Sequence, residues 1–492
     1  MKILFVLRTA GWFPYHQTTI DHLIARGHQV TLLFESKVEP PDDRGFQEWR
    51  ASGRRITVGE SLRRRGLLRR PLFAMREIRS YAGYCRRGPD VSFYRERWRR
   101  YLPLWLQGVL ARSRFTESVL RSQVTDGLLA ALERTAPPSL QIVRALRRDK
   151  PDCVVASPTN LLADEEVEYI KAANALGIPS IVPVLSWDNL TTKGLIHVRP
   201  DFILAWHHGH AEEARAIHGI PADRIVVTGS PFFDKWFDAT RRPGSRTAAC
   251  RRIGIDPSVP YLLYLGSSAN IARDESWLVL ALVRALREAH DPQVRRLQVV
   301  FKPYPGSSPR NLRVLPRLDE AGILVRGREH GRPNTTEGVG QFRDMLHHAA
   351  AVIGINTTGM IDAILCDRPC VALAVKRYRS TQMDTMHFRR MQESKALWTT
   401  RSVSGAVQAV SRILGGDDPT AAARRRFVAT YARPRGVGAQ AGEAAALAIE
   451  LVCGRMSGAA ITRAIDLELR NRPLPDPPPV EADPDEAVTA AG

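Results

Sequence analysis

The residue types best suited to hold a phosphorylated ligand follow a short apolar run that ends at Asn356. Thr357, Thr358 and Gly359 come next and open a predicted helix. Backbone N–H groups at a helix start lack intrahelical partners and carry partial positive charge, so they suit a diphosphate, and the threonine hydroxyls can donate as well. Asp362 stands one turn further in, within reach of a ribose or sugar diol. The alternative is a capped helix start with a solvent-facing aspartate.

Two other loops offer the same kind of chemistry. Gly266, Ser267 and Ser268 follow one predicted strand, and small residues there let the backbone approach phosphate groups. Lys302 ends the next predicted strand and can balance the charge of a diphosphate. The alternatives are an ordinary turn and a solvated lysine.

These loops need elements that position them. Continuous apolar runs of strand length alternate with helical stretches, which is typical of parallel sheets covered on both faces. The expected strands lie at 2–7, 29–34, 153–157, 178–185, 201–206, 224–229, 261–266, 297–303, 322–327, 350–356 and 369–375. We predict an α/β protein with two Rossmann-like domains whose parallel sheets face a cleft, where ligands bind outside the carboxyl ends of the strands.

The expected domains follow from the composition of the 492-residue chain. Residues 1–240 form the first expected domain, which carries a basic helical insert at 44–125. The second expected domain spans 241–432, after a polar stretch rich in proline and glycine. A C-terminal helix at 433–455 precedes a partly disordered tail at 456–492, which is rich in proline and acidic residues.

The segment around Asp362 resembles the nucleotide-binding segment of GT-B proteins related to UDP-GlcNAc 2-epimerases, CDP-glycerol glycerophosphotransferases and capsule-polysaccharide transferases. Their pattern reads roughly [S/T]-[S/G]-x3-[D/E]-x5-[K/R]-P-[V/I]. Counting back from Pro369 places Arg368 on the basic position. The resemblance implies that Asp362 contacts the nucleotide ribose and that Thr357 and Thr358 contact the phosphates.

Further loops resemble the same proteins. The stretch 302–305 (KPYP) is similar to a [K/R]-P-H-P element of CDP-glycerol and capsule-type transferases, with Tyr304 in place of the histidine. The families place donor-contacting residues on the loop after the last strand of the second domain. This implies that Gln382 or His387 touches the donor sugar.

In the first domain, a loop that follows a predicted strand contains Trp187, Asp188 and Asn189. This loop resembles a loop of surface-polysaccharide transferases. Trp187 offers a stacking surface and Asn189 a hydrogen-bonding amide for an acceptor. Asp188 is the leading candidate for the base that deprotonates an acceptor hydroxyl, and the alternative is an aspartate that caps the following turn. His16, on the loop after the first strand, is the second candidate base.

The loop at 157–160 also follows a predicted strand. Ser157, Thr159 and Asn160 are expected acceptor contacts.

The net charge is +20, and its excess is concentrated between residues 44 and 121, with twenty arginines, no lysine and six acidic residues. Aromatic residues are interleaved with these arginines: Tyr81, Tyr84, Phe93, Tyr94, Trp98, Tyr101 and Trp105. We interpret 44–121 as a patch for an anionic membrane surface or a lipid acceptor, with a solvated helix face as the alternative. We expect no nucleic-acid partner, because no recognisable nucleic-acid motif accompanies the charge.

Other classes are excluded by simple patterns. There is no apolar stretch of about 18 residues, and the N-terminal apolar run is too short for a signal peptide, so we expect a cytoplasmic protein that can lie peripherally at the membrane. The six cysteines form no CxxC pair. His207, His208 and His210 lack a completing carboxylate or cysteine at ligand spacing. We therefore expect no metal and no cofactor.

The predicted function is a metal-independent glycosyltransferase. It moves a sugar from a nucleotide-activated donor to an acceptor in envelope or surface-polysaccharide synthesis, either a glycan or a lipid-linked one. Alternatives are a CDP-polyol phosphotransferase, a non-hydrolysing UDP-sugar 2-epimerase, and a GT-B-like protein that binds a glycan or nucleotide without turnover. The oligomeric state is left open.

Overall fold

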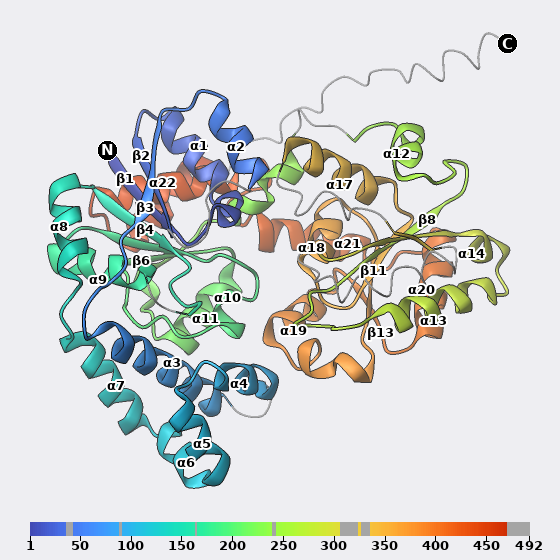
Figure 1. Ribbon diagram of the computed structural model, residues 1–492. Coiled ribbons are helices and arrows are strands. Elements are labelled where there is room, and N and C mark those ends of the chain that lie inside the picture. The colour runs from blue at the N-terminus through green and yellow to red at the C-terminus, as the bar shows by residue number, and fades with distance from the viewer. Residues whose placement is uncertain are drawn as a thin grey trace. The chain divides into compact units, whose positions relative to one another are not determined.

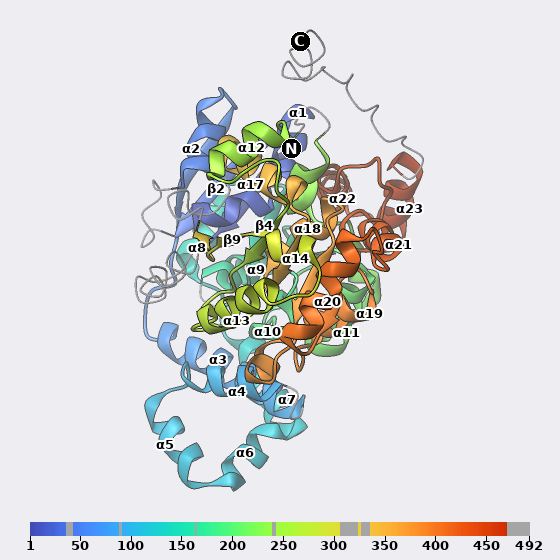
Figure 2. The same ribbon diagram turned by 90° about the vertical axis from the view of Figure 1, so that its right-hand side faces the viewer.

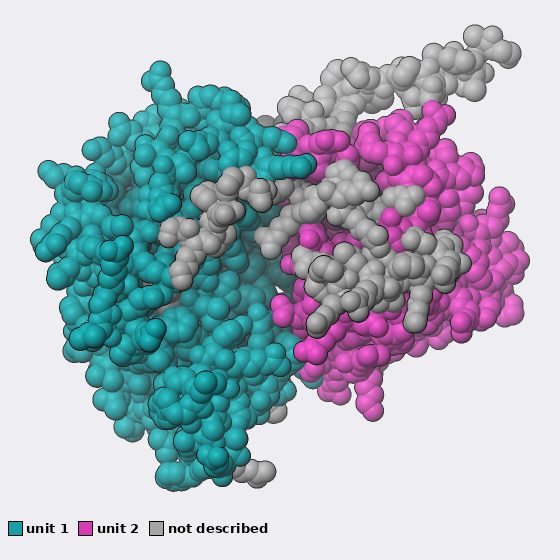
Figure 3. Space-filling view, viewed as in Figure 1, with its two compact units in different colours: residues 1–234, 384–387, 429–472 teal, residues 235–383, 388–428, 473–492 magenta. Residues whose placement is uncertain are grey.

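The computed structural model describes residues 1–35, 43–87, 91–162, 165–238, 243–305, 323–325 and 335–469, and the chain divides into two compact units (Figure 1). Unit 1 comprises Met1–Asp234, Asp384–His387 and Ala429–Arg472, and unit 2 comprises Lys235–Met383 and Phe388–Val428, as far as these ranges are described. Figure 3 colours the two units separately. The tail expected at 456–492 begins later than predicted, because residues 458–469 form a helix whose apolar side is buried, and from position 470 on it lies outside the described residues.

Unit 1 is built on a parallel sheet of seven strands within the described residues, in the order β3-β2-β1-β4-β5-β6-β7. The strands are β1 (Lys2–Leu7), β2 (Gln29–Glu35), β3 (Ile56–Ser61), β4 (Cys153–Ser157), β5 (Ser180–Pro183), β6 (Phe202–Ala205) and β7 (Ile225–Val227). β1 and β4 are buried along nearly their whole length, as parallel strands covered on both faces must be. Leu7 pairs with Ser157, so the loops after β1 and β4 begin at the same level of the sheet.

Helices cover both faces of this sheet. On one face, α1 (Gln17–Ala25), α22 (Ala441–Cys453) and α23 (Gly458–Leu469) pack on alternate residues of β1 and β2 in one apolar core. α9 (Glu165–Leu176) lies against β4 and β1, beside α8 (Leu140–Asp149). The C-terminal helices therefore complete the first unit, although they follow the second in sequence. Two short helices, α10 (Asn189–Thr192) and α11 (His208–His218), and 3-10 turns at Ala10–Tyr15, Ala222–Arg224 and Pro231–Phe237 fill the loops.

The basic insert is helical beyond residue 68, but its first part differs from the expectation. Residues 44–61 form α2 (Arg44–Ala51) and the edge strand β3, which pairs in parallel with β2. β3 was missed because an edge strand is only half buried and lacks an unbroken apolar run. The remaining helices form a lobe at one end of unit 1 (Figures 1 and 2). They are α3 (Arg69–Arg86), α4 (Ser92–Arg99), α5 (Leu104–Arg112), α6 (Arg114–Arg121) and α7 (Gln123–Thr135).

This lobe has a core of its own. Four of the aromatic side chains expected to meet a membrane lie inside it: Tyr81, Tyr84, Tyr94 and Trp98. Trp98 packs against both Tyr84 and Tyr101. The aromatic spacing therefore builds the lobe's interior, and Trp105 is the one of the seven that is strongly exposed.

Unit 2 repeats the architecture with six parallel strands within the described residues, ordered β10-β9-β8-β11-β12-β13. The strands are β8 (Tyr261–Leu265), β9 (Gln298–Lys302), β10 (Leu324–Val325), β11 (Ala351–Gly354), β12 (Cys370–Leu373) and β13 (Trp398–Thr400). β9, β8 and β11 are direct neighbours, so the loops that follow them leave the same edge of the sheet side by side. The expected fold class, α/β with parallel sheets, is confirmed in both units.

The helices of unit 2 flank its sheet. α13 (Ser276–Arg287) and α20 (Val403–Leu414) share an apolar core with β8, β9, β11 and β12. The others are α12 (Arg246–Ile253), α14 (Pro292–Arg296), α17 (Thr336–His348), α18 (Thr358–Leu365), α19 (Met386–Glu393) and α21 (Ala421–Phe427), with a 3-10 turn at Lys376–Thr381. A π turn at Val428–Ala432 begins at the end of unit 2 and continues into unit 1. Among the described helices, none combines the length and the apolar character needed to cross a bilayer.

Candidate functional site

The start of α18 forms the first element of a candidate nucleotide site in unit 2. Thr357 has extended backbone and makes no side-chain cap to the described part of the chain, while its carbonyl accepts from the Met360 N–H at 3.0 Å. Gly359 allows the helix to lie close to β8, since a Cβ at this position would come within 2.8 Å of the Leu265 side chain. Thr357, Thr358 and Gly359 remain partly accessible. The expected donors are thus at the surface of the unit at the end of β11.

The loop of Gly266, Ser267 and Ser268 is held by a residue that the sequence analysis missed. The Ser267 N–H donates to Glu275 Oε1 at 2.5 Å, and the Tyr264 hydroxyl donates to Oε2 at 3.0 Å. Burial raises the pKa of Glu275 to about 7. An acidic residue shortly after a glycine-containing loop was the available signal, but it is preceded by Asp274, and only the fold shows that the Glu275 carboxyl turns back to the loop.

Lys302 ends β9 beside this loop, where its carbonyl accepts from the Gly266 N–H at 2.8 Å. The lysine is 8% exposed, and its ammonium lies 5.3 Å from the centre of the Phe342 ring. No carboxylate of the described residues pairs with it, and burial lowers its pKa. A buried cation without a counter-charge is costly, and an anionic ligand would remove that cost. The solvated-lysine alternative does not fit this environment.

Asp362 lies on the first turns of α18 and is buried rather than solvent-facing. Its Oδ1 accepts a hydrogen bond from the Trp236 indole at 2.7 Å. Burial raises the pKa of Asp362 to about 6, against the opposing effects of Lys235 and the Trp236 hydrogen bond. Burial likewise lowers the pKa of Lys235 to about 8. The carboxylate and the ammonium therefore coexist as charges around neutral pH.

Two amides expected near the donor act within the protein scaffold. Asn356 donates to the Thr381 carbonyl at 2.8 Å. Gln382 is 0% exposed, and its amide donates to the carbonyls of Ile355 at 2.5 Å and Leu373 at 3.1 Å. A contact between Gln382 and a donor sugar does not fit this burial. The side chain instead ties the ends of β11 and β12 together.

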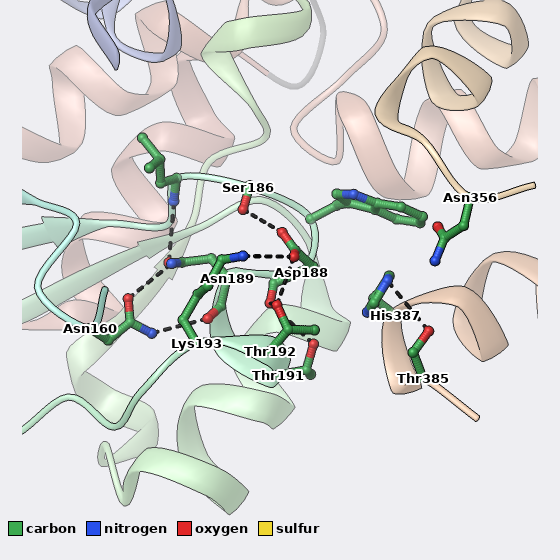
Figure 4. Close-up of polar contacts among 12 residues, drawn as sticks. Asn160, Ser186, Asp188, Asn189, Thr191, Thr192, Lys193, Asn356, Thr385 and His387 are labelled. Carbon is green, nitrogen blue, oxygen red and sulfur yellow. Dashed lines mark hydrogen bonds and ion pairs between the residues drawn. The ribbon is translucent and has the colours of Figure 1, made fainter. Parts of the chain in front are cut away.

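In unit 1, the loops after β4 and β5 are joined by a pair of buried amides (Figure 4). Asn189 Nδ2 donates to Asn160 Oδ1 at 2.9 Å, and Asn160 Nδ2 donates to the carbonyls of Asn189 at 3.0 Å and Gly194 at 3.1 Å. Ser157 similarly donates to the Pro183 carbonyl at 3.0 Å. These polar atoms, expected to contact an acceptor, already serve to hold the loops in register.

Asp188 is surrounded by donors in the same loop (Figure 4). Its carboxylate accepts from the Ser186 hydroxyl at 2.6 Å and the Thr192 hydroxyl at 2.7 Å, and it pairs with the Lys193 ammonium at 3.1 Å. Burial opposes ionisation, but Lys193, His387 and the two hydroxyls outweigh it and hold the pKa of Asp188 well below its usual range. Such a carboxylate is a weak proton acceptor at neutral pH. The geometry therefore does not support the expected role of Asp188 as the general base.

His387 lies in unit 1, although the flanking chain belongs to unit 2. Its ring meets the Trp187 ring edge-on with centroids 4.6 Å apart, and its Nε2 lies 3.4 Å from the Thr385 hydroxyl. Burial lowers the pKa of His387 to about 4, while Asp188 acts in the opposite direction. The residue expected among the donor contacts is thus part of the Trp187–Asp188 loop environment.

Two buried polar atoms at the ends of β1 and β4 lack a hydrogen-bond partner among the described residues. One is Nε2 of His16, whose pKa burial lowers to about 4. The other is the hydroxyl of Thr159. Buried polar atoms without partners are rare in folded proteins, and a bound ligand is one means of satisfying them.

The helical insert supports this side of unit 1. The Tyr84 hydroxyl donates to the Lys193 carbonyl at 2.7 Å, and Arg87 donates to the Thr191 carbonyl at 2.8 Å. The Leu195 N–H donates to the Ser80 hydroxyl at 3.1 Å. α3 therefore fixes the chain on the C-terminal side of Asp188. In the part of the chain that the structure describes, no set of three histidine, cysteine or acidic side chains gathers to hold a metal.

No protein-family model and no curated protein sequence matches the chain. Solved structures match it along nearly its whole length. UDP-GlcNAc 2-epimerase from Neisseria meningitidis, bound to UDP-GlcNAc, is 10% identical, with 93% of this chain and 100% of that chain covered and a TM-score of 0.53. The S. aureus MnaA–UDP co-structure is 11% identical, with 92% and 97% covered and a TM-score of 0.53. A glycosyltransferase from Rickettsia africae is 10% identical, with 95% and 98% covered and a TM-score of 0.49.

Identities this low show a shared fold and not a shared activity. The likeness confirms the expected fold, a GT-B-type arrangement of two Rossmann-like domains.

Proposed function

We propose that the chain is an enzyme acting on nucleotide-activated sugars, and specifically a glycosyltransferase that moves the sugar to an envelope or surface-polysaccharide acceptor. The observation that carries the proposal is Lys302, a buried ammonium without a carboxylate partner among the described residues. It ends β9, next to the Gly266–Ser268 loop after β8, and the α18 start follows the adjoining strand β11. A cation, a small-residue loop and helix N–H groups at one sheet edge suit a diphosphate.

In this proposal, unit 2 binds the donor. Lys302 and the N–H groups of Thr358 and Gly359 would stabilise the negative charge that develops on the leaving diphosphate. The Asp362 carboxylate would accept from the ribose hydroxyls. Because protein groups supply this positive charge, we expect transfer to proceed in the presence of EDTA.

Unit 1 would bind the acceptor and supply the base. We assign that role to a neutral imidazole in place of Asp188, because His387 and His16 are unprotonated at neutral pH and, although burial lowers the pKa of each to about 4, remain stronger proton acceptors than the Asp188 carboxylate. His387 is preferred, since the Asp188 carboxylate would stabilise the imidazolium formed when the acceptor hydroxyl loses its proton. Replacement of His387 by alanine should then lower kcat far more than it changes donor affinity.

The test is a panel of UDP-, GDP-, CMP- and CDP-linked donors incubated with and without extracted glycan and lipid-linked acceptors. A glycosyltransferase releases the nucleoside diphosphate, or CMP from a CMP-sugar, only when an acceptor is present. Release of CMP from a CDP-polyol would instead indicate polyol-phosphate transfer. Binding of a nucleotide without turnover would leave the chain as a binding protein and contradict the transferase proposal.

The second candidate is a UDP-sugar 2-epimerase. It is favoured by the fold likeness to a UDP-GlcNAc 2-epimerase bound to UDP-GlcNAc. Interconversion of UDP-sugars without any acceptor would establish it. Lys302 and Asp362 would bind the nucleotide in either reaction, so the two candidates differ in the ligand that the unit 1 site would bind.

A further inference from the structure

The outer helices of the insert expose an unusual set of large apolar side chains. Leu104 is 84% exposed and Trp105 67% on α5, Phe115 is 76% exposed on α6, and Val124 is 81% exposed on α7. The exposed set on these three helices also includes Val109, Val119, Leu128 and Leu132. We call these eight residues the apolar face. Since α5 contacts α6 and α6 contacts α7, these groups are exposed on neighbouring helices, and large apolar groups exposed together mark an interaction surface.

The spacing of these residues gathers them into stripes. Phe115 and Val119 are four residues apart on α6, and Val124, Leu128 and Leu132 follow at the same interval on α7. Residues four apart lie on one side of a helix. The two views of the molecule place α5 and α6 at the outer end of the lobe, beyond α3 as seen from the sheet of unit 1 (Figures 1 and 2).

The charges around the apolar face are predominantly positive. Every acidic residue of α5, α6 and α7 pairs with an arginine: Glu117 with Arg95 at 3.2 Å, Asp126 with Arg79 at 3.0 Å and Arg86 at 2.9 Å, and Glu133 with Arg76 at 2.8 Å.

By contrast, Arg112, Arg121 and Arg134 are exposed on the same helices and pair with no carboxylate of the described residues. The uncompensated charge available to a partner is therefore cationic.

The lobe is anchored firmly to the body of unit 1. Arg76 on α3 donates to Glu133 on α7 at 2.8 Å and to Glu168 on α9 at 2.7 Å, and all three side chains are buried. Lys171 on α9 pairs with Glu133 at 2.8 Å. A surface held in this way moves with the Rossmann body, so docking it would also orient the acceptor loops.

We propose that the apolar face lies on an anionic lipid bilayer, with α5 to α7 in the interfacial layer. Trp105 and Phe115 would enter the boundary between headgroups and acyl chains, and Arg112, Arg121 and Arg134 would meet lipid phosphates. A protein partner or a second copy would need matching acidic groups, whereas a bilayer supplies phosphates above an apolar layer. Of the seven aromatic residues expected from sequence to meet a membrane, only Trp105 belongs to this face, and the inference is independent of the proposed reaction.

The experiment is flotation of the full chain with vesicles of phosphatidylcholine alone and of equal parts phosphatidylcholine and phosphatidylglycerol. We expect binding to the anionic vesicles that weakens as salt rises from about 0.1 M to about 1 M, where the Debye length falls from ~10 Å to ~3 Å. The variant Trp105→Ser/Phe115→Ser should lower the partition coefficient about tenfold or more. The matched control is Leu467→Ser on α23, which removes a side chain 88% exposed outside the lobe.

A charge series tests the second half of the proposal. Arg112→Glu/Arg121→Glu should lower binding to anionic vesicles about tenfold or more. The control Arg251→Glu/Arg463→Glu makes the same change in net charge on α12 and α23 and should retain most of the binding. Equal losses in both double variants would show a general charge effect and overturn the proposal. Binding of Trp105→Ser/Phe115→Ser to anionic vesicles as strong as that of the wild type would also overturn the proposal. A dimer detected by sedimentation and abolished by this variant would overturn it too, since the face would then join two copies.

Discussion

The hydroxyl of Tyr84 donates a 2.7 Å hydrogen bond to the backbone carbonyl of Lys193, whose ammonium in turn pairs with Asp188 at 3.1 Å. Tyr84 belongs to the insert and Asp188 to the loop after β5. The insert is therefore part of the scaffold of the candidate acceptor site.

Removal of that hydroxyl should weaken both the fold and the site. Tyr84→Phe leaves the Lys193 carbonyl without its partner, and we expect unfolding to become easier by about 1–2 kcal/mol. If the loop serves an acceptor, the acceptor KM should rise while donor affinity stays unchanged. Tyr101→Phe, in the same lobe, is the control for chemical denaturation. Equal stability of the two variants would contradict the role given to the Tyr84 hydroxyl.

Gly194 stands where the insert and two loops meet. A Cβ at Gly194 would come within 2.7 Å of the Ser80 hydroxyl and 2.9 Å of the Trp98 ring. We expect Gly194→Ala to lose about 2–3 kcal/mol of unfolding free energy, because several packed groups must shift. Gly127→Ala, on α7 with no atom within 4 Å, should instead gain up to about 1 kcal/mol from helix propensity. Thermal and urea denaturation measure both, and a loss at Gly127 matching that at Gly194 would refute this account.

Lys302 should matter for the ligand more than for the fold. Lys302→Met keeps the apolar stem against Phe342 and removes a buried charge, so the free protein should be as stable as wild type or more stable. Affinity for UDP or the preferred nucleotide should fall about tenfold to a hundredfold, measured by calorimetry. The control is Lys395→Met, at the exposed turn before β13. Unchanged nucleotide affinity in Lys302→Met would remove the main support for the donor site.

The Asp362 carboxyl predicts a pH dependence. Its pKa is about 6 and that of Lys235 about 8, so both groups are charged between these values, and nucleotide affinity should be highest there. Affinity should fall below about pH 6, as protonation removes the acceptor for the ribose hydroxyls. The raised pKa also means that this group's ionisation costs stability, so its contribution to unfolding free energy should decline as pH rises from about 4 to about 6.

Calorimetric titration of UDP across this range provides the measurement. Phosphate groups titrate near the same pH, so Asp362→Asn is the necessary control: it should bind more weakly at pH 7 and show a flatter profile. Identical profiles for wild type and Asp362→Asn would assign the pH dependence to the nucleotide alone.

The parallel strands were largely predictable. β1 and β4 occur at the predicted residues, because a strand covered on both faces must be apolar throughout. β3 and β13 were not predicted because both are edge strands. The packing of α22 and α23 on the first sheet was not predicted either, because contacts across more than 400 residues leave no local signal.

The chemistry of individual side chains was less predictable. Lys302 and Asp362 stand in the expected loops, but their burial and partners come from the tertiary fold. The sequence pattern predicts that Tyr84 and Trp98 face a membrane, yet both side chains pack inside the insert. An amphipathic sequence pattern identifies the apolar side of a helix and does not say whether protein or lipid covers it.

The sequence by itself determined where the strands buried on both faces and the loops at their carboxyl ends lie, since such burial demands unbroken apolar runs. Only the tertiary structure decided which polar groups in those loops remain for a ligand. Asn160 and Asn189 are 29 residues apart in the sequence, and their side chains are hydrogen-bonded to each other. The physical reason is that hydrogen-bond partners are set by positions in space, which a local residue pattern does not specify.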